Sequence, residues 1–156
     1  MKNKVIGIIP ARMRASRFPG KPLVKIKGIP MIQHVFERAK MYSGWDQLMI
    51  ATCDKEIMNF AKHKNYPCIF TSKKHKRALD RVYEAASKIR NIKKNDIVVC
   101  VQADEPLLYP KMLQNLVLKL IRGKVDGAVA AMQIIHKKQF FDPNIVKIVN
   151  SKNGEV

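Results

Sequence analysis

Four cationic side chains gather near the start of the sequence, directly after the short apolar run Lys4–Ile9. They are Arg12, Arg14, Arg17 and Lys21. Guanidinium and ammonium groups match phosphate oxygens and offset charge in a phosphoryl-transfer transition state. The segment is neither GxxxxGK[ST] nor GxGxxG, and a solvated basic loop would have the same composition. Because Pro19 and Pro22 restrict the backbone, a preformed binding loop is favoured.

Two carboxylates follow a later apolar run. Asp104 and Glu105 come soon after Asp96–Val101, which has the clearest strand pattern in the chain. One or two carboxylates, together with substrate phosphates, can hold a hard cation such as Mg²⁺. A polar turn or a helix cap would explain the pair equally well. The basic loop and the strand-end acid together favour chemistry on a magnesium-bound nucleotide.

Other titratable residues are not predicted to be catalytic. Asp80 and Glu84 are one helical turn apart, but the neighbouring Arg77 and Arg81 favour ordinary ion pairs on a helix face. The four histidines have no ligand spacing, so neither zinc nor histidine catalysis is predicted. The three cysteines lie inside apolar runs, which favours buried reduced thiols and a cytoplasmic location.

Strand and helix patterns alternate along the chain. The expected strands are Lys4–Ile9, Leu48–Cys53, Cys68–Thr71, Asp96–Val101, Val125–Ile135 and Ile145–Val149. Four helices are expected. The first begins at Pro30, and the second runs from a cap at Asp54 to about Lys64. The third has an apolar face from Leu79 to Ile89, and the fourth begins at Pro110. This order predicts one α/β domain over residues 1–156, with a mostly parallel sheet and helices on both faces.

The predicted topology brings the polar segments together. Pro10–Lys21, Ser72–Asp80 and Gln102–Glu105 each follow an expected strand directly. In open α/β sheets the ligand site lies beyond the carboxyl ends of the strands. We therefore expect these three segments to meet at one edge of the sheet.

The net charge is +18, from 30 Lys and Arg against 12 Asp and Glu. A basic surface can bind nucleic acid by releasing counterions from phosphates. The charge is spread along the chain, however, and the cluster Lys73–Arg77 lacks interleaved aromatic residues. Small polyanions such as nucleoside triphosphates are therefore favoured over a specific nucleic acid. A membrane partner is not expected, because no apolar run approaches about eighteen residues.

Several segments, in order and with similar spacing, resemble the family of CMP-Kdo synthetases (3-deoxy-manno-octulosonate cytidylyltransferases). They include Ile9-Pro10-Ala11-Arg12, Ser16-Arg17, Pro19-Gly20-Lys21-Pro22-Leu23, Met31-Ile32-Gln33-His34-Val35, Ala51-Thr52, Val101-Gln102, Asp104-Glu105-Pro106-Leu107 and Phe141-Asp142-Pro143-Asn144. The resemblance implies a Rossmann-like, GT-A-like nucleotidyltransferase fold whose C-terminal part is absent from this chain. It also implies a homodimer if that part is present.

The resemblance further implies a Mg²⁺-dependent reaction in which CMP passes from CTP to an acidic sugar, a 3-deoxy-2-ulosonic acid, and pyrophosphate leaves. By position, Arg12 and Lys21 would neutralise the triphosphate, Gln102 would help to hold the cytidine, and Asp104 would hold Mg²⁺ and take part in catalysis. The nucleotide-binding set is completed by Pro10, Ala11 and Arg81. Transfers of this type depend mostly on positioning and charge neutralisation.

Two departures from the family pattern concern the same predicted site. Arg77-Ala78-Leu79 replaces Ser-Gly-Thr, which changes how this loop closes over the base or sugar, and Ala103 replaces a glycine. Two alternatives stay open. The chain could activate another acidic sugar, such as a sialic-type acid, or bind nucleotides and other polyanions without turnover.

Overall fold

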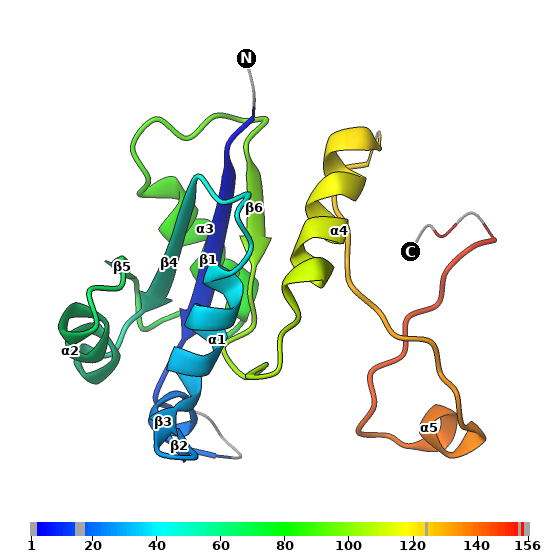
Figure 1. Ribbon diagram of the computed structural model, residues 1–156, viewed down its shortest axis with the longest axis horizontal. Coiled ribbons are helices and arrows are strands. Elements are labelled where there is room, and N and C mark those ends of the chain that lie inside the picture. The colour runs from blue at the N-terminus through cyan, green and yellow to red at the C-terminus, as the bar shows by residue number, and fades with distance from the viewer. Residues whose placement is uncertain (1–2, 15–17, 124, 153, 155–156) are drawn as a thin grey trace.

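The computed structural model describes residues 3–14, 18–123, 125–152 and 154; Ser16 and Arg17 lie outside them. Its centre is a parallel four-stranded sheet in the order β5-β4-β1-β6 (Figure 1). The strands are β1 (Val5–Ala11), β4 (Gln47–Thr52), β5 (Cys68–Phe70) and β6 (Ile97–Cys100). A short antiparallel pair, β2 (Lys25–Ile26) and β3 (Ile29–Pro30), lies apart from this sheet. The predicted parallel sheet is confirmed.

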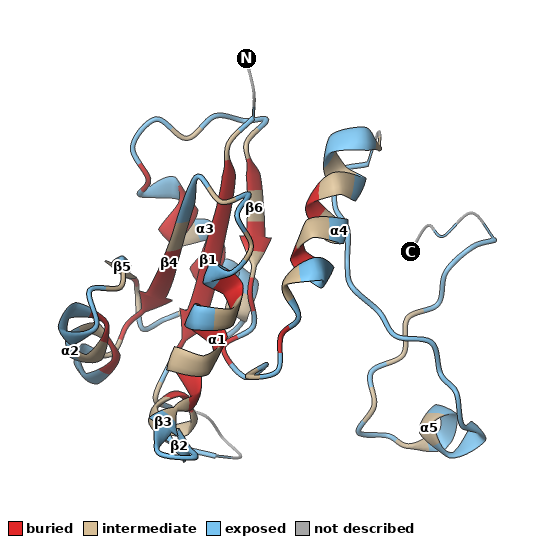
Figure 2. Ribbon diagram, viewed as in Figure 1, coloured by how far each residue is buried: buried red, intermediate tan, exposed pale blue. Residues whose placement is uncertain are grey.

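Helices cover both faces of the sheet, as predicted. The helices that pack on the sheet are α1 (Met31–Lys40), α2 (Lys55–His63), α3 (Ala78–Ser87) and α4 (Pro110–Arg122). The short helix α5 (Lys137–Phe141) lies away from the sheet (Figure 1), and η1 (Lys21–Leu23) is a 3₁₀ turn. Alternate residues of β1 face opposite sides. Ile9 packs in one core with residues of α1, α2 and α4, whereas Ile8 packs in a second core against α3. The sheet therefore separates two apolar layers (Figure 2).

Two expected element boundaries shift. Pro10 was expected to begin a loop, but β1 continues through it to Ala11. The ladder between β1 and β6 pairs residues up to Ile8, so a proline, which has no N–H to donate, breaks no bond with β6 at this point. Pro30 precedes α1 as its N-cap rather than opening the helix.

The buried face of α3 agrees only in part with the expected one. Val82, Ala86 and Ile89 are buried as expected, whereas Leu79 and Tyr83 are 66% and 78% exposed. Helical spacing shows which apolar residues lie on the same side of the helix, and tertiary packing decides which of them are buried against the sheet.

The close approach of Trp45 and Leu48 to β1 predicts a stability effect at Gly7. A Cβ at Gly7 would lie 2.7 Å from Leu48 Cδ1 and 3.1 Å from the Trp45 ring. Because strands flank β1 on both sides, Gly7→Ala has to displace these side chains. We expect it to lower the free energy of unfolding by about 1–3 kcal/mol, measured by urea denaturation. Gly127→Ala, where a Cβ meets nothing within 4 Å, is the control; equal losses in both variants would contradict the packing argument.

The expected strands Val125–Ile135 and Ile145–Val149 are wrong: neither segment forms a strand in the structure. After α4 the chain runs away from the sheet, and most of it is exposed (Figures 1 and 2). Val129, Met132 and Ile135 are 59%, 84% and 73% exposed. A strand pattern yields a strand only where another strand supplies hydrogen bonds, and none of the described residues does so here.

The cysteines are free thiols, with Cys53 buried and Cys68 and Cys100 partly buried. Burial raises the pKa of Cys68 to about 11 and also raises the pKa of Cys100. These two thiols are therefore protonated and weakly nucleophilic at neutral pH. Among the described residues, no helix is both long enough and apolar enough to cross a membrane.

Candidate functional site

A cleft of about 250 Å³ lies at the carboxyl ends of β1 and β6. Every residue that the sequence placed in the site lines it: Pro10, Ala11, Arg12, Lys21, Arg81, Gln102 and Asp104. They come from the ends of two adjacent strands, from η1 and from α3. The structure thus brings together the three polar segments that were expected to meet at one edge of the sheet.

The basic loop after β1 is fixed at its base by two backbone hydrogen bonds. Met13 N donates to Asp54 Oδ2 at 2.8 Å, and Gly20 N donates to Met13 O at 2.7 Å. Gly20 has φ +75°, a conformation that residues with a Cβ rarely adopt, and η1 begins directly after it. The loop therefore returns to the cleft and places Lys21 there.

Asp54 serves a different purpose from the predicted one. It occupies the N-cap position of α2, but its side chain makes no capping bond to that helix. Its carboxylate accepts the Met13 amide instead, across 41 positions of sequence. Sequence spacing gave no signal for this contact.

Lys21 and Asp104 form an ion pair within the cleft, with Lys21 Nζ 2.7 Å from Asp104 Oδ2. Their side chains are 36% and 51% exposed. Exposed ion pairs of this kind contribute little to stability, so the pair exchanges readily for other partners. Both groups are therefore available to a ligand that offers anionic oxygens to Lys21 and a cation to Asp104.

Arg81 is buried, with 3% of its surface exposed. Its Nη1 donates to Thr71 Oγ1 and, at 3.3 Å, to Ser72 O. Among the described residues no carboxylate forms an ion pair with it. A buried cation held by neutral oxygens alone remains attractive to anions and to polar acceptors in the cleft.

The loop between β5 and α3 contributes three further basic residues to the cleft wall, namely His75, Lys76 and Arg77. Sequence reasoning identified this segment but gave these residues no individual roles. Among the described lining residues, Asp104 alone carries a carboxylate. The cleft is therefore strongly cationic.

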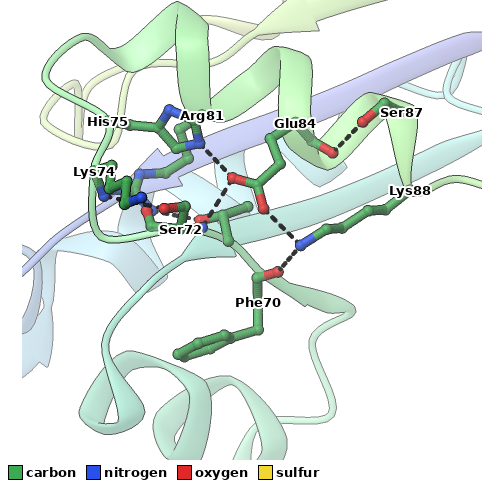
Figure 3. Close-up of polar contacts among 9 residues, drawn as sticks. Phe70, Ser72, Lys74, His75, Arg81, Glu84, Ser87 and Lys88 are labelled. Carbon is green, nitrogen blue, oxygen red and sulfur yellow. Dashed lines mark hydrogen bonds and ion pairs between the residues drawn. The ribbon is translucent and has the colours of Figure 1, made fainter.

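Glu84 holds this loop (Figure 3). Its carboxylate accepts hydrogen bonds from Ser72 N at 2.8 Å and from Lys88 Nζ at 2.6 Å, and it contacts His75 Nε2. Hydrogen bonds from Lys88, Ser72 and His75 lower the pKa of Glu84 to about 2. The expected pairing of Glu84 with a neighbouring arginine is wrong, because Arg81 turns inward to Thr71. The four-residue spacing of Glu84 and Lys88 was the available signal.

The side chains of the cleft suit a metal ion that takes most of its ligands from substrate and water. The described residues contain no group of three or more His, Cys, Asp or Glu side chains that could hold a metal ion. Asp104 would therefore need further oxygen ligands from substrate phosphates and water, which is the usual coordination of Mg²⁺. Neither a zinc site nor an all-protein calcium site fits these residues.

The profile of the cytidylyltransferase family matches residues 6–156. The 3-deoxy-manno-octulosonate cytidylyltransferase of Thermodesulfovibrio yellowstonii is 40% identical over 154 residues, which cover 96% of this chain and 60% of that protein. The enzyme of the same name from Haemophilus influenzae is 40% identical over 149 residues, covering 96% and 58%. The chain thus spans about three fifths of the length of these relatives.

Solved structures agree with the sequence matches. A CMP:2-keto-3-deoxy-manno-octonic acid synthetase complexed with CTP aligns with TM-score 0.72 and 35% identity, over 77% of this chain and 48% of that one. A cytidylyltransferase from Leptospira borgpetersenii aligns with TM-score 0.67 and 25% identity, over 79% and 51%. A 4-diphosphocytidyl-2C-methyl-D-erythritol synthase, at 17% identity and TM-score 0.62, shares the fold. The predicted nucleotidyltransferase fold and the predicted resemblance are confirmed, and the chain belongs to the cytidylyltransferase family.

Proposed function

We propose that this chain forms, as a single domain, the CTP-binding part of a cytidylyltransferase that transfers CMP from CTP to a 3-deoxy-2-ulosonic acid and releases pyrophosphate. The observation that carries the proposal is the cleft in which Arg12 and Lys21 face Asp104 at the carboxyl ends of β1 and β6. The names of the 40% identical relatives and the CTP complex of the similar structure support it.

Each cleft residue has a role in this proposal. Arg12 and Lys21 bind the triphosphate and neutralise the charge that grows on the departing pyrophosphate. Gln102, at the end of the β6 segment, offers an amide that both donates and accepts hydrogen bonds, which suits the cytosine edge. Pro10 and Ala11 present the end of β1 to the nucleoside, and Arg81 offers a buried cation beside it.

Asp104 would hold Mg²⁺, which when bound neutralises phosphate charge and orients the α-phosphate. Lys21 Nζ is paired with the Asp104 carboxylate. Triphosphate draws Lys21 toward its own oxygens and leaves Asp104 free for the cation. The ion pair thus keeps both groups in place before the substrate arrives.

One observation favours a second function, nucleotide binding without turnover. The two partners of the ion pair in the cleft, Lys21 and Asp104, are 36% and 51% exposed to solvent. A ligand held at this cleft alone would be incompletely shielded from water. Activation of a sialic-type acid has less support, because the relatives named above are Kdo enzymes. Dimerisation and a cytoplasmic location stay predictions.

A pyrophosphate-release assay tests the proposal. We expect release from CTP only when Mg²⁺ and an acidic sugar are both present, with Kdo the best of a panel of ulosonic and sialic acids. Reactions lacking the metal or the sugar are the controls. Mg²⁺-dependent CTP binding without release would establish the binding function instead. No CTP binding at any Mg²⁺ concentration would contradict both functions.

A further inference from the structure

One part of the cleft lining is a loop with an unusual concentration of charge. Five consecutive residues, Lys73 to Arg77, carry basic side chains, and the last three line the cleft. These groups repel one another and also repel Arg12 and Lys21 across the cleft. This repulsion favours a loop that moves away from the cleft, unless another contact holds it.

Glu84 supplies that contact from the second turn of α3. One oxygen of its carboxylate, Oε2, accepts the Ser72 amide at 2.8 Å and contacts His75 Nε2. The other oxygen accepts Lys88 Nζ at 2.6 Å, and the same ammonium donates to Phe70 O at 2.8 Å. A single acidic side chain thus joins the end of β5, the start of the loop and its middle (Figure 3).

The position of Glu84 separates it from the proposed binding residues. It is absent from the residues that line the cleft, whereas His75, which it contacts, is among them. Its partner Lys88 is a cation, and its carboxylate also lies beside a strongly basic loop, so it offsets part of the charge of that loop. Hydrogen bonds to an ionised acceptor are stronger than neutral ones, which suits a contact that must hold a repelling segment.

We propose that Glu84 is a positioning residue for the cytidylyltransferase site: it holds the loop Ser72–Arg77 against the cleft so that His75, Lys76 and Arg77 face the nucleotide. The inference rests on the proposed function. Glu84 acts through the loop and does not touch the substrate. Its removal lowers affinity for CTP by releasing one wall of the cleft.

The test compares Glu84→Ala and Glu84→Gln with the unaltered chain by calorimetric titration of CTP in Mg²⁺. We expect Glu84→Ala to weaken CTP binding about tenfold. Glu84→Gln should lose less, about threefold, because its amide oxygen still accepts the Ser72 N–H. Glu56→Ala, which removes an exposed carboxylate from α2, controls for the change in net charge and should bind CTP normally.

Limited trypsin digestion supplies a readout that a general loss of stability would not give. The loop offers cleavage sites after Lys73, Lys74, Lys76 and Arg77, and Lys62 and Lys64 at the end of α2 offer reference sites. In Glu84→Ala, cleavage within the loop should accelerate about tenfold relative to the reference sites, because the freed loop opens locally. A parallel increase at all sites would show a purely structural role and overturn the proposal.

The outcomes separate this inference from the proposed function. If the unaltered chain does not bind CTP, the proposed function fails, and the digestion still tests whether Glu84 holds the loop. If the unaltered chain binds CTP and both Glu84 variants bind it equally well, the positioning role is wrong. If Glu84→Ala does not fold, Glu84→Gln decides the question: a roughly threefold loss of CTP affinity with faster cleavage in the loop than at the reference sites supports the role, and unchanged affinity overturns it.

Discussion

Asp104→Asn is expected to abolish metal-dependent CTP binding and to lower any turnover by about 100-fold or more. The substitution keeps the size of the side chain but removes its charge, and asparagine is a much weaker ligand for Mg²⁺. Asp104 is the carboxylate among the described cleft-lining residues, so no neighbour replaces it. CTP titrations over a range of Mg²⁺ concentrations measure the loss.

Glu105→Gln is the matched control for this substitution. Glu105 is the next residue, is exposed, and is not among the residues that line the cleft. The two variants change the net charge equally, so a general electrostatic effect would appear in both. Metal dependence that persists unchanged in Asp104→Asn would remove Asp104 from the metal site.

Lys21→Ala is expected to weaken binding of CTP about 10- to 100-fold and binding of CMP by less than about threefold. An ammonium that serves the β- and γ-phosphates has little to contact in a monophosphate. Titrations of the two nucleotides in the same buffer give the ratio. Equal losses for CTP and CMP would contradict the phosphate role.

The ion pair also predicts that Lys21→Ala strengthens the binding of a metal ion, although it weakens the binding of CTP. Lys21 Nζ lies 2.7 Å from Asp104 Oδ2, so removing it frees the carboxylate. Mn²⁺ should then bind more tightly in the absence of nucleotide, while CTP binds more weakly. Lys25→Ala, an exposed lysine of β2 outside the cleft, should change neither affinity.

The place of the site at the edge of the sheet could be predicted from the sequence, because local patterns determined where the strands end. The apolar runs before Pro10 and Gln102 became β1 and β6, which lie side by side in the sheet. Parallel strands place their carboxyl ends at one edge, so Arg12 and Asp104 had to be near one another, whereas the place of Lys21 also depends on the loop contacts of Met13 with Asp54 and Gly20. The convergence of Arg12 and Asp104 followed from the order of the elements and needed no knowledge of side-chain packing.

Contacts between distant segments could not be predicted in this way. The Asp54 side chain accepts a hydrogen bond from Met13, 41 positions away, and Glu84 accepts one from Ser72, 12 positions away. Short-range spacing rules cover pairs three or four residues apart and do not reach these partners. The prediction for Val125–Ile135 failed for a related reason: its pattern fits a strand, but a strand also needs backbone pairing with another strand, which a local pattern does not determine.

The outer edge of β6 has consequences for how this protein behaves at high concentration. Among the described residues β1 is its one strand partner, and the apolar side chains after α4 are exposed nearby. Unpaired strand edges are templates for intermolecular association, which the charge of +18 opposes by mutual repulsion. Added salt shortens the range of that repulsion, from about 10 Å at 0.1 M to about 3 Å at 1 M. Colloidal stability and affinity for CTP therefore decline together as ionic strength rises, so low-salt solutions favour both.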